Sequence, residues 1–250
     1  MGTAIGVVGG VGPYAGIDLV KKIFDQTIAR KDQEHLDVYL SNIPRVINDR
    51  TDFLLHGGDN PAQGLLLSAQ KLISIGATTI VIPCNTAHAL TIFGTVKDQL
   101  AIEHPNVQLL HMIEETAKEI TRQFPANVTI GLMATLGTHA AKVYQQTLAS
   151  YPQVTIIEPE ITEQRCIHEA IYDQSYGIKA VSPVTEKAIQ SIKKEGQRLI
   201  DRGAQALILG CTELPLALKN GDLSVPLIDP TLVLARSAIA ATAIEKLRPL

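Results

Sequence analysis

At 250 residues the chain is long enough for one large domain or two smaller ones, so its length does not fix the number of domains. Hydrophobic residues make up 46% and charged residues 19%, which is typical of a globular protein and excludes a disordered or fibrous one. With 22 Lys and Arg against 25 Asp and Glu, the net charge of -3 argues against binding to nucleic acid or to an anionic membrane.

Apolar strand-like runs alternate with helix-length periodic stretches, which predicts parallel sheets covered by helices, an α/β fold. In chain order we expect strands at 4–8, 36–43, 78–82, 107–110, 128–133, 154–158, 205–209 and 226–228. The helices expected between and after them are at 16–30, 61–75, 113–124, 139–150, 161–173, 182–201 and 232–246.

An internal repeat divides the chain into two similar halves. Residues 76–84 (GATTIVIPC) align without a gap with 203–211 (GAQALILGC), and residues 5–12 (IGVVGGVG) resemble 130–137 (IGLMATLG) at nearly the same spacing. We therefore expect two open parallel-sheet units related by a pseudo-twofold axis, with an active site in the cleft between them. The predicted units are 1–105 plus 225–250, carrying Cys84, and 106–224, carrying Cys211.

The chain has three cysteines, Cys84, Cys166 and Cys211. Their odd number and wide spacing do not form a disulfide framework, so we expect free thiols and a cytoplasmic location. No apolar run approaches the roughly 18 residues of a membrane helix, and no signal-peptide pattern is present, so we expect no membrane partner.

Cys84 and Cys211 each follow one of the repeated strands. A lone cysteine in this position is more often a small buried residue, and Cys84 with His88 could share a metal ion, although no third ligand accompanies them. The repeated placement favours two working thiols, whereas Cys166 has no counterpart in the repeat and is predicted to be structural. Two opposed thiols suit removal of a proton from one face of a carbon and its return to the other, which is racemisation or epimerisation.

A thiol must be activated for this chemistry, because an ordinary cysteine, with a pKa of about 8.5, is only a few per cent thiolate at pH 7. Helix N-termini after the two cysteines and the neighbouring donors would favour ionisation. The adjacent candidates are Asn85, Thr86 and Thr212.

The glycines at 10, 12 and 16 could suggest a dinucleotide site. Their spacing is GxGxxxG rather than GxGxxG, and the acidic residue expected near Ile43 is missing. We predict an anion-binding or close-approach turn instead, which disfavours a nucleotide-binding module.

The sequences PCNTAH at 83–88 and GCTELP at 210–215 resemble the paired signatures of the aspartate/glutamate racemase superfamily. Glu213 stands where glutamate racemases usually carry His, so the chain looks most like the aspartate racemase branch. GGVGP at 9–13 and NDRT at 48–51 resemble that branch's GGMGP and PDRT, and the resemblance spans nearly the whole chain.

The resemblance implies a racemase that interconverts L- and D-aspartate, with glutamate as the second candidate, and that needs no pyridoxal phosphate, metal or nucleotide. Cys84 and Cys211 would be its two acid/base residues. Arg50 and Lys179 would each pair a carboxylate of the dicarboxylic amino acid, and a homodimer is the default assembly. The other implied substrate-site residues are Gly12, Asn85, Thr86, Thr135, Thr212 and Glu213.

Several alternatives stay open at this point. A hydantoin racemase, a maleate isomerase or an arylmalonate decarboxylase would belong to the same superfamily, although the last commonly works with a single cysteine. A regulatory protein that binds a ligand without turnover is a different class. Residues 173–176 (DQSY) look like an insertion just before Lys179, which leaves the role of that lysine open.

Overall fold

A computed structural model of the chain describes residues 3–249. These residues form two compact units, of which Thr116–Pro230 is the second and the rest of the described chain is the first. Each unit contains a four-stranded sheet in which all strands are parallel, so the predicted α/β class is confirmed. Among the described helices, none combines the length and apolar character that crossing a membrane requires.

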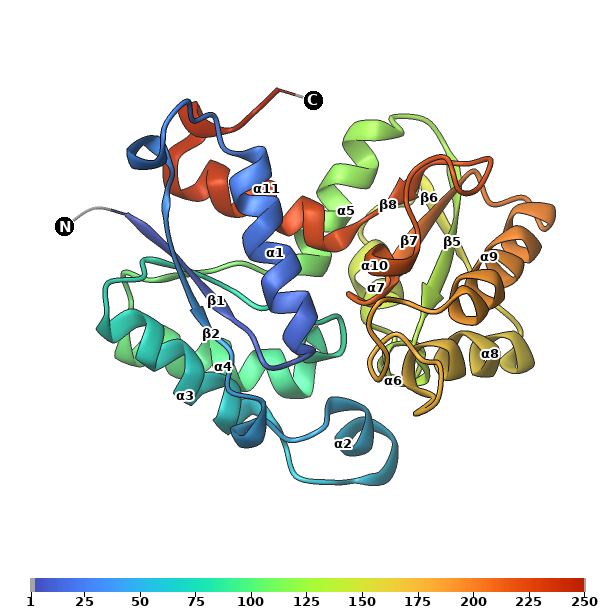
Figure 1. Cartoon of the computed structure of the whole chain (residues 1–250), viewed down its shortest axis with the longest axis horizontal. Helices are drawn as coiled ribbons and strands as arrows, with labels where there is room; N and C mark the ends of the chain where they lie inside the picture. The colour runs from blue at the N-terminus through green and yellow to red at the C-terminus, as the bar shows by residue number, and fades with distance from the viewer. Residues whose placement is uncertain (1–2, 250) are drawn as a thin grey trace. The chain divides into compact units, whose positions relative to one another are not determined.

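The first unit has a central sheet with the strand order β2-β1-β3-β4 (Figure 1). Helices α1 and α11 lie on one side of this sheet, and α3 and α4 lie on the other. Its strands are β1 (Ala4–Val8), β2 (Asp37–Ser41), β3 (Thr79–Val81) and β4 (Gln108–Leu109). Its α-helices are α1 (Pro13–Gln26), α2 (Arg50–His56), α3 (Ala62–Ser74), α4 (Leu90–Glu103), the start of α5 (Met112–Gln123), and α11 (Pro230–Ala243). Short 3₁₀ helices are η1 (Asp32–Glu34), η2 (Pro44–Val46), η3 (Thr86–His88) and η4 (Ile244–Lys246).

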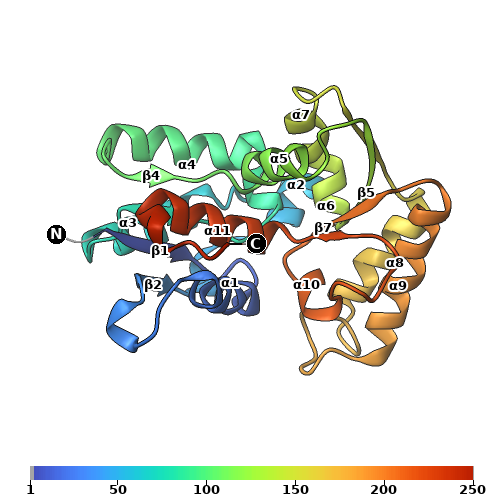
Figure 2. The ribbon, with the colours of Figure 1, turned by 90° about the horizontal axis from the view of Figure 1, so that it is seen from above.

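The last long helix, α11, packs along the first sheet although it comes from the end of the sequence (Figure 2). The Thr242 hydroxyl is 3.2 Å from that of Thr79 in β3, and Arg236 Nη1 donates to Gln26 Oε1 at the end of α1.

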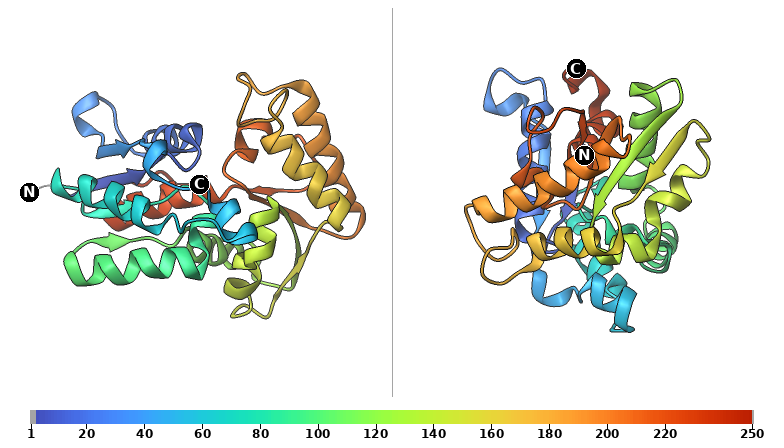
Figure 3. Two further views of the ribbon diagram at one scale, coloured as in Figure 1. Left: turned by 90° about the horizontal axis from the view of Figure 1, so that it is seen from below. Right: turned by 90° about the vertical axis from the view of Figure 1, so that its right-hand side faces the viewer.

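The second unit has a sheet with the equivalent order, β6-β5-β7-β8. Helices α8 and α9 pack side by side against β5 in this unit (Figure 3). Its strands are β5 (Val128–Ala134), β6 (Val154–Ile157), β7 (Ala206–Gly210) and β8 (Leu227–Ile228). Its helices are the remainder of α5, α6 (Leu136–Ala141), α7 (Val143–Leu148), α8 (Ile161–Tyr172), α9 (Glu186–Asp201) and α10 (Leu214–Ala217).

Two glycines show that the sequence repeat is also a structural repeat. Gly6 of β1 pairs with Ile80 of β3, and Gly131 of β5 pairs with Leu207 of β7. A Cβ atom at Gly6 would lie 2.7 Å from Ile80 Cδ1, and one at Gly131 would lie 2.6 Å from Leu207 Cδ2. The missing side chain therefore lets the same surroundings approach the first strand of each unit closely.

All eight predicted strands are present among the described residues, but several helices differ from the prediction. The helix expected at 139–150 is two helices, because Lys142 adopts a left-handed conformation with φ 50° between α6 and α7. Helix α9 begins at Glu186 rather than at 182, after Thr185 accepts a hydrogen bond from the Ala188 N–H. Helices α2, α4 and α10 lie outside the ranges predicted for the helices, although helix N-termini were expected after the two cysteines. In α4, exposed apolar residues at Leu90 and Ile102 obscure the helical pattern.

Candidate functional site

In the first unit, Cys84 lies just beyond the carboxyl end of β3. The strand ends before Pro83, which has no N–H to continue the ladder. Cys84 is only 6% exposed, and its Sγ lies 3.3 Å from Thr86 Oγ1. Asn85 and Thr86 are also buried where η3 begins. The thiol is thus held in a buried turn beside a neutral hydroxyl group.

The side chain of His88 stabilises this turn through a hydrogen bond to its backbone. Its Nδ1 is 2.8 Å from the Cys84 carbonyl oxygen, so Nδ1 carries the proton and donates it to that oxygen. The ring stacks on Phe93 and meets the edge of His111. Burial, with a smaller effect of the charge on His111, lowers the pKa of His88 to about 3. His88 is therefore a neutral supporting residue, and no group of three or more His, Cys, Asp or Glu suited to a metal ion occurs in the described part of the chain.

We expect His88 to make the protein less stable in acid. The folded-state pKa, about 3, lies below the value of about 6.5 in the unfolded chain, so the unfolded chain binds the proton more readily. The free energy of unfolding should fall as the pH drops from about 6.5 towards 3, by up to roughly 4 kcal/mol. His88→Asn keeps an N–H donor but does not titrate, and urea unfolding at a series of pH values should show a shallower acid slope. An acid slope in His88→Asn equal to that of the unmodified protein would contradict the assignment.

Arg50 and Gly12 belong to other loops at the same edge of the first sheet. Arg50 is the first residue of α2, is buried, and donates through Nη1 to the Asn48 carbonyl oxygen at 3.2 Å. Helix α2 packs against η3, which brings the Arg50 segment next to the Cys84 turn. Gly12 precedes α1 with φ 110°, a conformation that favours glycine. A Cβ at Gly10, two residues earlier, would lie 2.9 Å from the Pro44 nitrogen, so this loop is a close-approach turn.

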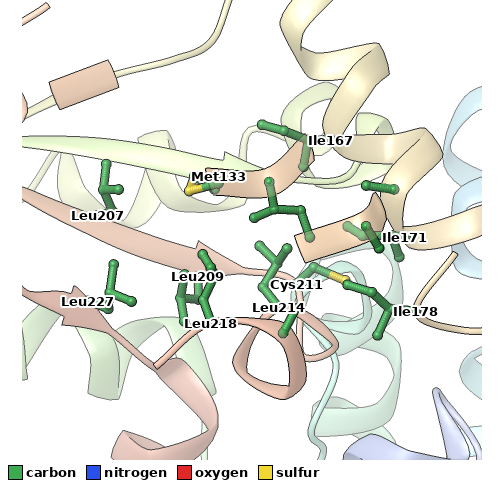
Figure 4. Packing of buried hydrophobic residues seen from close by; sticks show 14 of the residues in the cluster. Met133, Ile167, Ile171, Ile178, Leu207, Leu209, Cys211, Leu214, Leu218 and Leu227 are labelled. Carbon is green, nitrogen blue, oxygen red and sulfur yellow. The ribbon is translucent and has the colours of Figure 1, made fainter. Parts of the chain in front are cut away.

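In the second unit, Cys211 occupies the position after β7 that corresponds to Cys84. It is 7% exposed and belongs to the hydrophobic cluster that includes Ile178 and Leu214 (Figure 4). Its thiol donates to Glu213 Oε2 at 3.0 Å, and the Thr212 hydroxyl donates to the same oxygen at 3.4 Å. Lys179 Nζ donates to the other oxygen, Oε1. Four of the predicted site residues are therefore joined in one group, in which Cys211, Thr212 and Glu213 are buried and Lys179 is partly buried.

The charges of this group have opposing effects on the thiol. Burial, and then the negative charge of Glu213, raise the pKa of Cys211 well above its ordinary value, while Lys179 acts in the opposite direction. Burial alone would lower the pKa of Lys179, but Glu213 and Cys211 outweigh it, so that the pKa is raised. Lys179 is consequently a firmly protonated cation, and Cys211 is a thiol rather than a thiolate.

The apparent insertion before Lys179 forms a compact turn. Asp173 Oδ1 accepts hydrogen bonds from the backbone N–H groups of Ser175 and Tyr176. The chain then folds back onto the end of α8, where the Lys179 N–H donates to the Ile171 carbonyl oxygen at 3.0 Å. Residues 173–176 thus form a turn that returns the chain to the end of α8, and the Lys179 side chain binds Glu213.

Thr135 directly follows β5 and is the N-cap residue of α6. Its hydroxyl caps α6 by accepting from the Thr138 N–H, and it lies 3.2 Å from the Thr138 hydroxyl. Thr135 is buried at the carboxyl edge of the second sheet.

Sequence reasoning missed Tyr144 and Asp229. Tyr144 is fully buried, and burial, the charge of Asp229 and that of Cys211 all raise its pKa well above the ordinary value. Tyr144 is therefore a neutral phenol. A signal for Asp229 existed, because it directly follows β8 and polar residues at the carboxyl ends of parallel strands commonly face a site. Nothing in the sequence singled out Tyr144.

Comparison with known proteins identifies the family. The model of the Asp/Glu/Hydantoin racemase family matches residues 8–238. The chain belongs to this family. The broad specificity amino-acid racemase RacX of Bacillus subtilis is 25% identical over 244 residues, which cover 94% of this chain and 96% of RacX.

Two solved structures of racemases have similar folds. The aspartate racemase of Picrophilus torridus has a TM-score of 0.81 at 26% identity, covering 96% of this chain and 94% of that one. A glutamate racemase of Francisella tularensis, in complex with D-glutamate, has a TM-score of 0.64 at 20% identity and covers 99% and 84% of the two chains. The second likeness concerns the fold alone.

Proposed function

We propose that this member of the racemase family interconverts the enantiomers of an acidic amino acid, aspartate first and glutamate second. One observation carries the proposal: Cys84 and Cys211 occupy equivalent positions, after β3 and β7, in two units with the same strand order. The Picrophilus torridus relative is named an aspartate racemase, which supports the order of substrates, and RacX is named a broad specificity racemase.

The proposed mechanism uses two bases. One thiolate takes the Cα proton, so that the C–H bond breaks, an S–H bond forms and the electron pair moves into the α-carboxylate. The other thiol donates its proton to the opposite face and becomes a thiolate. Atoms and charges balance without an added group, and the two cysteines exchange roles for the other enantiomer.

The Cα proton of an amino acid is weakly acidic, so the developing negative charge must be stabilised. A turnover of about 10 per second corresponds to a barrier of only about 16 kcal/mol. Arg50 and Lys179 are proposed to bind the two carboxylates, because a planar guanidinium suits bidentate pairing and a second cation suits the side-chain carboxylate. Gly12, Asn85, Thr86 and Thr135 are proposed to complete the substrate site.

Proton NMR in deuterated water tests this function directly. We expect L-aspartate incubated with the enzyme to gain deuterium at Cα while the D form appears, and L-glutamate to react more slowly. Exchange with neither acidic amino acid would refute the substrate assignment. Parallel incubations with neutral amino acids and with a hydantoin would then identify a broad specificity racemase or a hydantoin racemase.

A further inference from the structure

We propose that Glu213 acts on Cys211 rather than on the substrate: its carboxylate keeps Cys211 protonated in the resting enzyme, so that Cys211 is the acid and Cys84 the base for the enantiomer whose Cα–H bond faces Cys84. This inference rests on the proposed two-thiol function and assigns the roles within it. In it Glu213 is a positioning residue that sets the protonation state of the thiol.

The hydrogen bonds of Glu213 carry the argument. An ionised carboxylate can only accept, so the 3.0 Å contact between Cys211 Sγ and Glu213 Oε2 requires the proton to be on sulfur. Lys179 holds the other oxygen, and Thr212 donates to Oε2, so both oxygens are occupied within the protein. Glu213 is 3% exposed. A carboxylate in this position would also repel the carboxylates of an acidic substrate, which argues against direct binding.

The repeat supplies the contrast. The residue two positions after the cysteine is Glu213 in the second unit and Thr86 in the first. Thr86 Oγ1 lies 3.3 Å from Cys84 Sγ, and a hydroxyl can donate to a thiolate as well as accept from a thiol. Equivalent positions thus hold a fixed negative charge beside one sulfur and an adaptable neutral group beside the other.

The other groups around Cys211 are consistent with this assignment. Lys179, from the loop after α8, supplies the compensating positive charge and also lies over the Tyr172 ring. Tyr144 of α7 is a neutral phenol, because burial, followed by the electrostatic effects of Asp229 and Cys211, raises its pKa. Once Cys211 has given up its proton, its thiolate would face the Glu213 carboxylate. That repulsion favours return of a proton to Cys211 before the next turnover.

The test is a titration that needs no substrate. In a Cys84→Ser, Cys166→Ser background Cys211 is the sole thiol, and the ultraviolet absorbance of its thiolate is followed against pH. Glu213→Gln removes the negative charge and should lower the pKa of Cys211 by about 1–3 units. Lys179→Gln removes the positive charge and should raise it. Glu163→Gln, which alters a carboxylate bound to Arg202 in the same unit, should leave it unchanged.

The opposite directions of the two pKa shifts exclude a merely structural role. Both Glu213→Gln and Lys179→Gln break the same ion pair, so a structural effect would shift the pKa of Cys211 in the same direction in both variants. Circular dichroism would verify that each variant is folded. An unchanged or raised pKa in Glu213→Gln would overturn the proposal, as would shifts of the same sign in both variants. If the titration fails while Cα exchange occurs in the unmodified enzyme, only this inference falls. If the titration succeeds without Cα exchange, it is the proposed racemase function that falls.

Discussion

Replacing either Cys84 or Cys211 with serine is expected to slow racemisation about 10²- to 10⁴-fold, the usual contribution of a positioned acid or base. A serine hydroxyl is far less acidic than a thiol, so it is not deprotonated at neutral pH. It therefore cannot replace the cysteine as the acid or the base of the two-base mechanism. The loss should appear mainly in kcat, because the two residues proposed to bind the substrate carboxylates, Arg50 and Lys179, are unchanged. Chiral chromatography of aspartate after incubation measures the rate directly.

The two variants should also differ from each other. Each keeps one thiol, which can remove and return a proton on its own side of Cα. In deuterated water we therefore expect each variant to label one enantiomer without inverting it, and the two variants to label opposite enantiomers. Labelling should be slower in Cys84→Ser, because its remaining thiol, Cys211, is held protonated. Cys166→Ser is the matched control, because Cys166 is a half-buried residue of α8, and it should retain activity within about twofold. Full activity in either of the first two variants would refute the two-base mechanism.

The strands and the positions of the two cysteines can be predicted from the sequence, because a short local pattern determines them and this pattern occurs twice in the chain. A buried parallel strand is a short apolar run, and the same run recurs before Cys84 and Cys211. The family signatures contain the cysteines, so they give the family as well, and the family model confirms it.

Contacts between segments distant in sequence could not be predicted in this way. The bond from Lys179 to Glu213 depends on how residues 173–176 fold back onto α8, which is decided by Asp173 accepting two backbone N–H groups. The position of Tyr144 in α7 depends on the left-handed residue Lys142, which divides a stretch that the sequence predicts to be one helix. A lysine gives no sign of such a conformation, because it is uncommon for residues other than glycine and asparagine.

Gly6→Ala is expected to destabilise the first unit by about 3 kcal/mol, a large value for one methyl group. The new Cβ would lie 2.8 Å from Ala77 Cβ and 3.1 Å from Leu72 Cβ, in addition to its approach to Ile80. Ala77 has no flexible side chain that can move aside, so β1 must shift relative to the loop before β3. At Gly131 the nearest atom is the terminal methyl group of Leu207, which can turn away, so Gly131→Ala should cost only about 1 kcal/mol.

Urea unfolding followed by circular dichroism tests this order, and two further variants sharpen it. Gly94→Ala places its methyl group 3.7 Å from the nearest atom, within α4, and should stabilise the protein by about 0.5–1 kcal/mol because alanine favours a helix. Adding Ala77→Gly to Gly6→Ala removes the methyl group that it strikes and should restore part of the loss. Equal losses of unfolding free energy in Gly6→Ala and Gly131→Ala, or no gain in stability on adding Ala77→Gly, would contradict this explanation. Either result would show that close packing against the loop before β3 does not hold β1 in place. Recovery would show that the packing of Gly6 in β1 helps to position β3, the strand that precedes Cys84.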